Sequence, residues 1–209
     1  LLSTALLESV KTKDLNIIRL ISELGQNLAE GELNKIFLAN NIIVDEDAYF
    51  EVIDKKTASL MRASIAIGAI TGGADNEMIE RFTQLGSILG ISFQIRDDIF
   101  DYFKKDVGKP TGNDIREGKI TLPLIYALQH APEAISAEMM EIIKSRDYSD
   151  DNISRLLTFS KEQGGIDYAY RKVNALIENA EQMVLGFRLN EDMELLMRLF
   201  LSYLKDRRY

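Results

Sequence analysis

Apolar residues recur at intervals of three and four along almost the whole chain, and this pattern predicts an all-helical (all-α) protein. No segment alternates apolar and polar residues between hairpin turns, so we expect no β-sheet. All 3 prolines lie between positions 110 and 132, which leaves long proline-free segments on both sides. The predicted helices cover residues 2–9, 14–39, 46–70, 76–104, 120–130, 133–144, 150–163, 166–186 and 190–207.

Acidic residues precede several of these helices, where a carboxylate can accept hydrogen bonds from free backbone amides. The expected N-caps are Asp14, Asp45, Asp75 and Asp150. The pairs Gly72-Gly73 and Gly164-Gly165 are expected to end the helices before them. No internal repeat or low-complexity linker interrupts the 209 residues, so we expect a single domain over 1–209.

The predicted helix over 76–104 has two distinct faces. Apolar side chains form a packing stripe that consists of Leu85, Ile88, Ile95, Ile99 and Tyr102. The second face begins with small residues and ends with polar ones, in the order Gly86, Gly90, Gln94, Asp97 and Asp101. Since small residues let a bulky group approach a helix, we expect an elongated apolar ligand along this face, with an anionic head near the carboxylates.

Three carboxylates end this helix within the sequence FQIRDDIFD: Asp97, Asp98 and Asp101. Like charges spaced i,i+3 and i,i+4 oppose helix formation by roughly 0.2–0.5 kcal/mol per pair. A hard cation would remove this repulsion, and carboxylates without histidine or cysteine favour Mg²⁺, which commonly also takes phosphate oxygens. On spacing alone, a solvated acidic helix face is the alternative.

Composition narrows the possible classes of protein. The chain has no cysteine and one histidine, which excludes disulfides, thiolate metal sites and multi-histidine metal sites, and indicates a reducing compartment. The net charge of −8 argues against nucleic acid as a partner. No run of residues is apolar for long enough to predict a transmembrane helix. The segment 104–123 has five basic and three acidic residues, so it can fold back over the carboxylates that precede it.

Lys56 falls on the apolar face of the predicted helix 46–70, one turn from both Val52 and Leu60. A lysine directed inward needs an anion, because burial of an unpaired charge is costly. Thr57 beside it offers a hydroxyl group to the same oxyanion. The alternative is a lysine whose stem covers the apolar face while its ammonium group reaches water.

Together, the segments KKTASL, FQIRDDIFD and GKPTGNDIREGKITLP resemble the trans-isoprenyl diphosphate synthases, the polyprenyl synthetase family, in order and spacing. The resemblance runs over essentially the whole chain, which looks like the C-terminal two-thirds of such an enzyme, of the bacterial octaprenyl-type long-chain branch. It implies a helical bundle around a central cavity, with the N-terminal helices missing, and a cytoplasmic homodimer. In this family Mg²⁺ assists ionisation of an allylic prenyl diphosphate. Isopentenyl diphosphate then attacks the carbocation, and diphosphate is released.

The resemblance also assigns the metal-binding residues. It implies that Asp97, Asp98 and Asp101 form the second aspartate-rich motif of the family. Asp97 is then the direct Mg²⁺ ligand, and the other two act largely through metal-bound water. Asp114 matches a carboxylate that supports the metal site from outside its direct ligands. No side-chain base is required, since the departing diphosphate is thought to accept the proton.

The diphosphate-binding positions follow from the same resemblance. The family positions that hold the allylic diphosphate, or close over it from the loop, correspond here to Lys56, Thr57, Gln94, Lys109 and Lys119. In the C-terminal DRRY, Arg207 and Arg208 stand where family tails can approach isopentenyl diphosphate.

The first of the family's two facing aspartate-rich motifs has no counterpart here, since no such cluster precedes Lys56. The chain also begins with Leu-Leu inside a helical pattern, so we expect a fragment that holds half of the metal site and does not elongate prenyl chains alone. One rival interpretation is a non-catalytic or partner-dependent subunit of a heteromeric prenyl synthase, although the intact second motif argues against it. Another is a terpene cyclase or head-to-head condensing enzyme, which generally lacks the GKPxGxDxxEGK loop.

Overall fold

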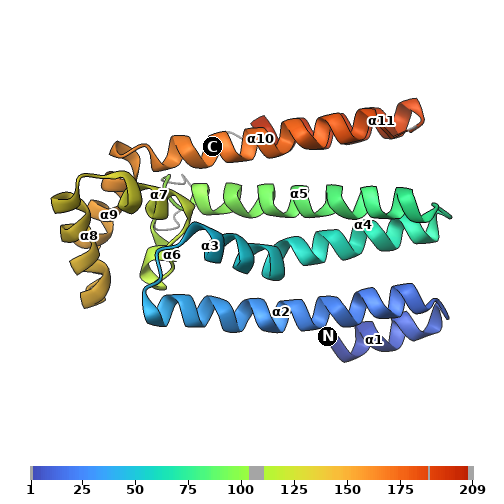
Figure 1. The fold of residues 1–209 in the computed structure, drawn as a ribbon, viewed down its shortest axis with the longest axis horizontal. Helices are drawn as coiled ribbons and strands as arrows, with labels where there is room; N and C mark the ends of the chain where they lie inside the picture. Colours follow the sequence, from blue (N-terminus) through green and yellow to red (C-terminus); the bar gives the residue numbers. More distant parts are fainter. Residues whose placement is uncertain (1, 104–110, 188, 207–209) are drawn as a thin grey trace.

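The computed structural model describes residues 2–103, 111–187 and 189–206, and within these ranges the protein is helical with no β-strand. Its long helices run side by side along one axis, while α6 to α9 gather at one end of the bundle (Figure 1). This arrangement confirms the predicted all-helical fold. In the described ranges the helices, and one π-helical turn named η1, are α1 (Leu2–Lys11), α2 (Leu15–Asn41), α3 (Glu46–Ile53), η1 (Asp54–Ala58), α4 (Ser59–Thr71), α5 (Asn76–Phe100), α6 (Asn113–Arg116), α7 (Leu122–His130), α8 (Glu133–Ser145), α9 (Asp150–Glu162), α10 (Gly165–Leu185) and α11 (Glu191–Asp206).

Three of the four predicted N-caps are confirmed by hydrogen bonds from backbone amides to the side chains of Asp14, Asp45 and Asp75. The prediction for Asp150 is wrong by one position, because Ser149 is the N-cap of α9 and Asp150 is its first residue. An acidic residue in the first turn still interacts favourably with the positive end of the helix dipole. Asp150 therefore did mark the start of α9, one position away from the N-cap.

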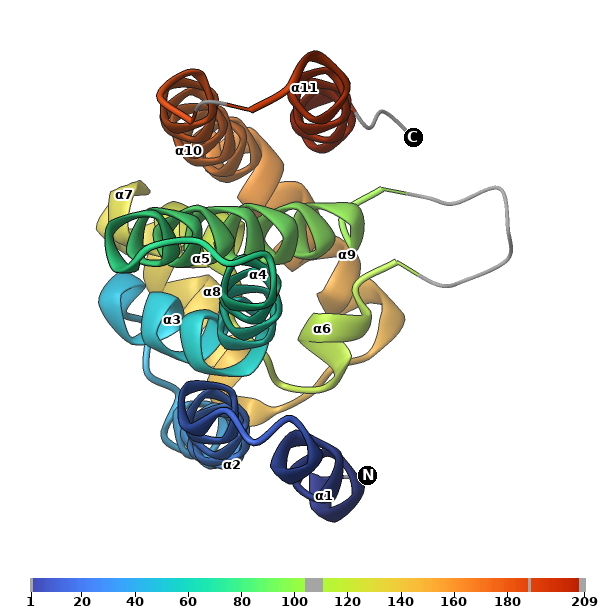
Figure 2. The same ribbon diagram turned by 90° about the vertical axis from the view of Figure 1, so that its right-hand side faces the viewer.

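Helix α5 lies in the middle of the bundle, with α4 on one side and α10 on another (Figure 2). Its predicted packing stripe is buried at Leu85, Ile95 and Ile99, none of which exposes any surface. Burial of such a stripe contributes about 1.5–3 kcal/mol per large apolar side chain. The stripe therefore fixes how α5 is rotated, and with it the directions in which its polar residues point.

The small residues on the second face of α5 have a different role from the predicted one. A Cβ atom on Gly90 would lie 2.4 Å from the Ala58 Cα atom, and one on Gly86 would lie 2.8 Å from the Arg62 Cα atom. The bulky group that these glycines admit is therefore the backbone of η1 and α4. The expectation of an apolar ligand along the glycines is wrong, because a neighbouring helix occupies that space.

The predicted continuous helix over 46–70 is interrupted by the π-helical turn η1. The turn rotates α4 relative to α3, so Leu60 is 51% exposed although Val52 and Ile53 are buried. The predicted apolar face through Leu60 is therefore wrong. A side-chain clamp spans the turn, since the Arg62 guanidinium donates to both carboxylate oxygens of Asp54 at 3.1 and 2.9 Å.

Candidate active site

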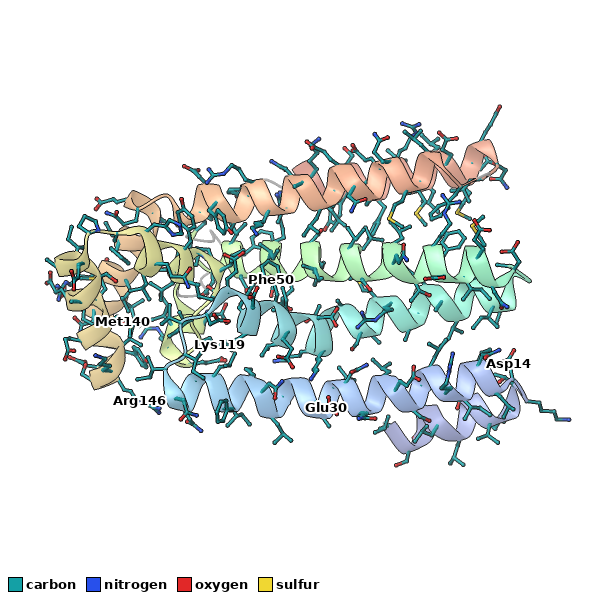
Figure 3. The ribbon with its side chains drawn as sticks, in the orientation of Figure 1. Asp14, Glu30, Phe50, Lys119, Met140 and Arg146 are labelled. Carbon is teal, nitrogen blue, oxygen red and sulfur yellow. The ribbon has the colours of Figure 1, made fainter. Side chains whose placement is uncertain are left out.

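A cavity of about 270 Å³ lies at the end of the bundle where α2, α3, η1 and α5 meet the segment from Asp114 to Ile125. In Figure 3, Lys119 marks this end of the molecule. The cavity wall includes seven of the residues singled out from the sequence, which are Lys56, Thr57, Gln94, Asp97, Asp98, Asp114 and Lys119. The rest of the wall is largely apolar and includes Leu38, Val52 and Ile125. The fold thus gathers these charged groups from η1, α5 and the segment from Asp114 to Ile125 beside an apolar surface.

A chain of hydrogen bonds connects the buried side of the cavity to its open side. The Tyr49 hydroxyl donates to Asp98 Oδ2 at 2.7 Å, and Gln94 Nε2 donates to Asp98 Oδ1 at 2.8 Å. The Thr57 hydroxyl in turn donates to Gln94 Oε1 at 2.6 Å. Both ends of the Gln94 amide are therefore fixed, and one of its N–H groups stays available to a ligand. The hydrogen of the Thr57 hydroxyl is already used, so this group presents lone pairs to the cavity.

Asp98 is the buried centre of this chain, with 5% of its surface exposed. Burial raises the pKa of its carboxyl group to about 7, and the hydrogen bonds from Tyr49 and Gln94 oppose that rise. Both oxygens accept a hydrogen bond from the protein. In this arrangement Asp98 positions Gln94 and, through it, Thr57.

Asp101 holds the segment that follows α5. Its two carboxylate oxygens accept hydrogen bonds from the backbone amides of Asn113 and Asp114, at 3.0 and 2.8 Å. The backbone N–H of Gly112, a residue with a φ of 76°, donates to the Asp101 carbonyl oxygen at 2.9 Å. Burial raises the pKa of the Asp101 carboxyl group, while the two amide hydrogen bonds oppose the rise. Asp101 therefore fixes the start of α6 and lies outside the cavity wall.

Asp97 differs from both neighbours in the motif. Its side chain is exposed, lines the cavity and makes no hydrogen bond or ion pair with another described residue. No three acidic or histidine side chains of the described ranges lie close enough together to share a metal ion. The fold accordingly leaves one carboxylate of the motif free to act as a metal ligand, and that carboxylate is Asp97.

Lysines supply the cationic part of the cavity wall. Lys119 forms ion pairs with Asp114 at 2.7 Å and with Glu117 at 2.8 Å. Burial opposes its charge, but the hydrogen bonds to these two carboxylates outweigh burial, so the pKa of Lys119 lies above its ordinary value. Lys56 is 41% exposed and reaches Glu32 of α2 at 3.3 Å, so its ammonium group is paired at the cavity edge.

Among the residues that the sequence patterns missed are Lys35 and Tyr49 in the cavity wall and Glu32, which pairs with Lys56. Tyr49 had a usable signal, because it lies one helical repeat of seven residues before Lys56. Glu32 and Lys35 had none, since α2 carries no motif that links it to the other walls. Lys109, Arg207 and Arg208 lie outside the described residues.

The helical bundle thus has a cavity whose wall includes the Asp97 carboxylate and the lysines Lys56 and Lys119. Such a cavity is typical of a protein that binds an anionic ligand together with a metal ion. The chain belongs to the polyprenyl synthetase family, whose profile matches residues 1–159.

Solved structures and curated proteins agree with this assignment. The fold is similar to that of geranylgeranyl pyrophosphate synthase from Bacteroides thetaiotaomicron, with 39% identity, a TM-score of 0.91, and coverage of 98% of this chain and 68% of that one. Polyprenyl synthase from Caulobacter crescentus, solved as a complex with calcium and isoprenyl diphosphate, has 28% identity, a TM-score of 0.84, and coverage of 95% of this chain and 61% of that one.

Among curated relatives, geranylfarnesyl diphosphate synthase of Aeropyrum pernix is 30% identical over 192 residues, which are 90% of this chain and 59% of that protein. Other relatives are named as short-chain, solanesyl and octaprenyl synthases. The chain spans between 37% and 59% of the length of the first three curated relatives. Within the described ranges, no helix combines the length and the apolar character that crossing a membrane requires.

Proposed function

We propose that this chain forms the allylic-diphosphate half of a polyprenyl diphosphate synthase. The parent enzyme condenses isopentenyl diphosphate with an allylic prenyl diphosphate and releases diphosphate. The observation that carries the proposal is the placement of the free Asp97 carboxylate in the same cavity as Lys56 and Lys119. A metal-bound diphosphate needs both kinds of group, and separate elements supply them.

The donor set fits Mg²⁺, which commonly takes one or two carboxylates and completes its coordination with phosphate oxygens and water. Asp97 would hold the ion directly, while Asp98 and Asp101 would keep the helix end and the following segment in place. When bound, Mg²⁺ supplies positive charge next to the leaving diphosphate. The structure of the Caulobacter crescentus relative with calcium and isoprenyl diphosphate supports this choice of ligand class.

The residues of the chain itself would carry out three tasks. Lys56 and Lys119, together with Lys109, would stabilise the charge that grows on the departing diphosphate more strongly than the charge of the bound substrate. Gln94 would orient the diphosphate through its remaining N–H group. The apolar wall near Val52 and Ile125 would keep water and nucleophiles away from the carbocation.

The finer assignments belong to the same proposal. An octaprenyl-type product, a homodimer, a cytoplasmic location and a role for Arg207 and Arg208 near isopentenyl diphosphate all follow from the resemblance. The 209 residues hold one aspartate-rich motif, so condensation would require the facing motif from the rest of the protein. A partner-dependent subunit of a heteromeric synthase is the alternative, since another chain would then supply that motif.

Two measurements test the proposal. The intact parent protein with Mg²⁺ and both substrates should release diphosphate, and Asp97→Ala should lower turnover by orders of magnitude without unfolding the protein. Lys119→Ala should mainly weaken diphosphate affinity. Near-normal turnover of Asp97→Ala would refute the metal assignment. Activity that appears only after a second chain is added would favour the alternative.

A further inference from the structure

Helix α2 brings two charged residues to the cavity, Glu32 and Lys35. The Lys35 side chain lines the cavity, is 27% exposed, and forms an ion pair with Glu32 one turn earlier. The second oxygen of Glu32 reaches the ammonium group of Lys56 on η1 at 3.3 Å. A single carboxylate thus holds two ammonium groups that come from two different elements.

Ordinary helix-surface pairing does not account for this arrangement. Other Glu–Lys pairs with the same i,i+3 spacing occur in the described ranges at Glu8–Lys11 and Glu141–Lys144. Their lysine side chains are 70% and 56% exposed, and neither pair lines the cavity. Exposed pairs of this kind contribute little to stability. Lys35 differs because it is more buried and because its partner carboxylate is shared with the cavity lysine Lys56.

A third ammonium group occupies the same region. The hydrogen bond from Lys119 is the largest cause that lowers the pKa of Glu117, and the charges of Lys35 and Lys56 lower it further. Lys35, Lys56 and Lys119, which come from α2, η1 and the segment before α7, all line the same cavity. Like charges repel when gathered in a partly buried cavity, so they require anions nearby. Glu32, Asp114 and Glu117 supply those anions within the protein.

We propose that Lys35 is a further lysine that binds the diphosphate, and that Glu32 is an internal counter-ion which the diphosphate displaces from Lys35 and Lys56. The inference rests on the proposed function and adds a residue to its substrate site. A lysine ammonium group offers three donors on a flexible stem, so it can leave a carboxylate for a phosphate oxygen. Glu32 stays on the helix, and the two lysines turn from it toward the ligand.

The test is calorimetric titration of the full chain with inorganic diphosphate and Mg²⁺, with Lys35→Gln and Glu32→Gln as the variants. Lys35→Gln should weaken binding about tenfold, because a charge-assisted hydrogen bond is lost. Glu32→Gln should tighten binding severalfold, because the competing anion is removed. Lys11→Gln, which breaks a pair of the same spacing outside the cavity, should leave the affinity unchanged.

The opposite signs of the two effects separate binding from structural support. If the Glu32–Lys35 pair only supported the fold, both variants would lose thermal stability. Their diphosphate affinities would then not move in opposite directions. Unchanged affinity of Lys35→Gln beside a weakened Lys119→Ala would overturn the inference and leave the proposed function standing. Weaker binding by Glu32→Gln would overturn the counter-ion role. No binding by the unaltered chain, with or without Mg²⁺, would overturn both proposals.

Discussion

The middle of α5 packs closely because two of its residues lack side chains, whereas the end of the helix is held by hydrogen bonds to carboxylates. At Gly86 and Gly90 the backbone of a neighbouring helix comes within the distance that a Cβ atom would occupy. At Asp98 and Asp101 every carboxylate oxygen accepts a hydrogen bond from the protein. The close packing fixes the rotation of the helix, and that rotation decides that Asp97 faces the cavity while Asp98 faces Tyr49.

Substitution of Gly90 by alanine should produce the largest effect. The new Cβ atom would overlap the Ala58 backbone, and overpacking against backbone should lower the free energy of unfolding by about 3 kcal/mol. The control is Gly68→Ala in α4, where nothing lies within 4 Å of the added Cβ atom. That variant should gain up to about 1 kcal/mol from helix propensity. Equal effects of the two substitutions in urea unfolding would contradict the role of close packing in the middle of α5.

The carboxylate end of α5 should make stability depend on pH. The pKa of Asp98 is about 7 in the folded protein and roughly 3.9 in an unfolded chain, so the folded state binds more protons between these values. Stability should therefore fall as pH rises through this window. Relative to Asp98→Asn, the free energy of unfolding should drop by roughly 1 kcal/mol per pH unit between about pH 5 and 7. The measurement is urea unfolding without Mg²⁺ at a series of pH values. If the free energy of unfolding changed with pH in the same way in the unaltered protein and in Asp98→Asn, Asp98 would not be the titrating group.

Tyr49→Phe should have a smaller effect. It removes one hydrogen bond to a buried carboxylate and keeps the ring, so about 1 kcal/mol of stability should be lost. Since this hydrogen bond opposes the rise in the pKa of Asp98, its loss should also move the pH-dependent window upward. Tyr102→Phe is a matched control, because that buried hydroxyl pairs with Thr121 at 3.4 Å, whereas the hydroxyl that donates to Asp98 belongs to Tyr49. An upward shift in both variants would argue against a specific Tyr49–Asp98 link.

Asp97→Ala should have the smallest effect on stability, within about 0.5 kcal/mol, because the side chain is exposed and forms no hydrogen bond or ion pair with another described residue. Titration with inorganic diphosphate should nevertheless lose its dependence on Mg²⁺. A large loss of stability would mean that Asp97 supports the fold in the way that Asp98 does.

Periodic patterns predicted most of the fold, because helix positions depend on local spacing and capping. The bounds of α2, α5 and α10 agree with the predicted segments to within a few residues. The π-helical turn η1 was not predicted. The order of apolar and polar residues from Asp54 to Ala58 does not distinguish i,i+5 from i,i+4 backbone hydrogen bonding. Gly86 and Gly90 were misinterpreted because a glycine does not reveal whether a ligand or a helix approaches it.

The candidate site was predicted only where a local motif marked it. Asp97, Gln94 and Lys56 were found by their motifs, and they do lie around one cavity. Lys35 was missed, since its contribution depends on contacts between helices distant in sequence, whereas Tyr49 could have been found from its spacing to Lys56. The different environments of Asp97, Asp98 and Asp101 were also beyond the sequence, because they arise from the rotation of α5 against its neighbours.

The turn η1 sets the angular phase between the two helices it joins. Each residue of an α-helix advances by about 100°, and a π-helical turn contains one extra residue. If this segment were a regular α-helix without the extra residue, α4 would be rotated by about 100° about its axis from its present position relative to α3. Either Lys56 would leave the cavity, or Ala63 and Ala66 would lose their buried positions. Deletion of one residue from η1 should thus be more harmful than most substitutions there, because it changes the phase of a whole helix.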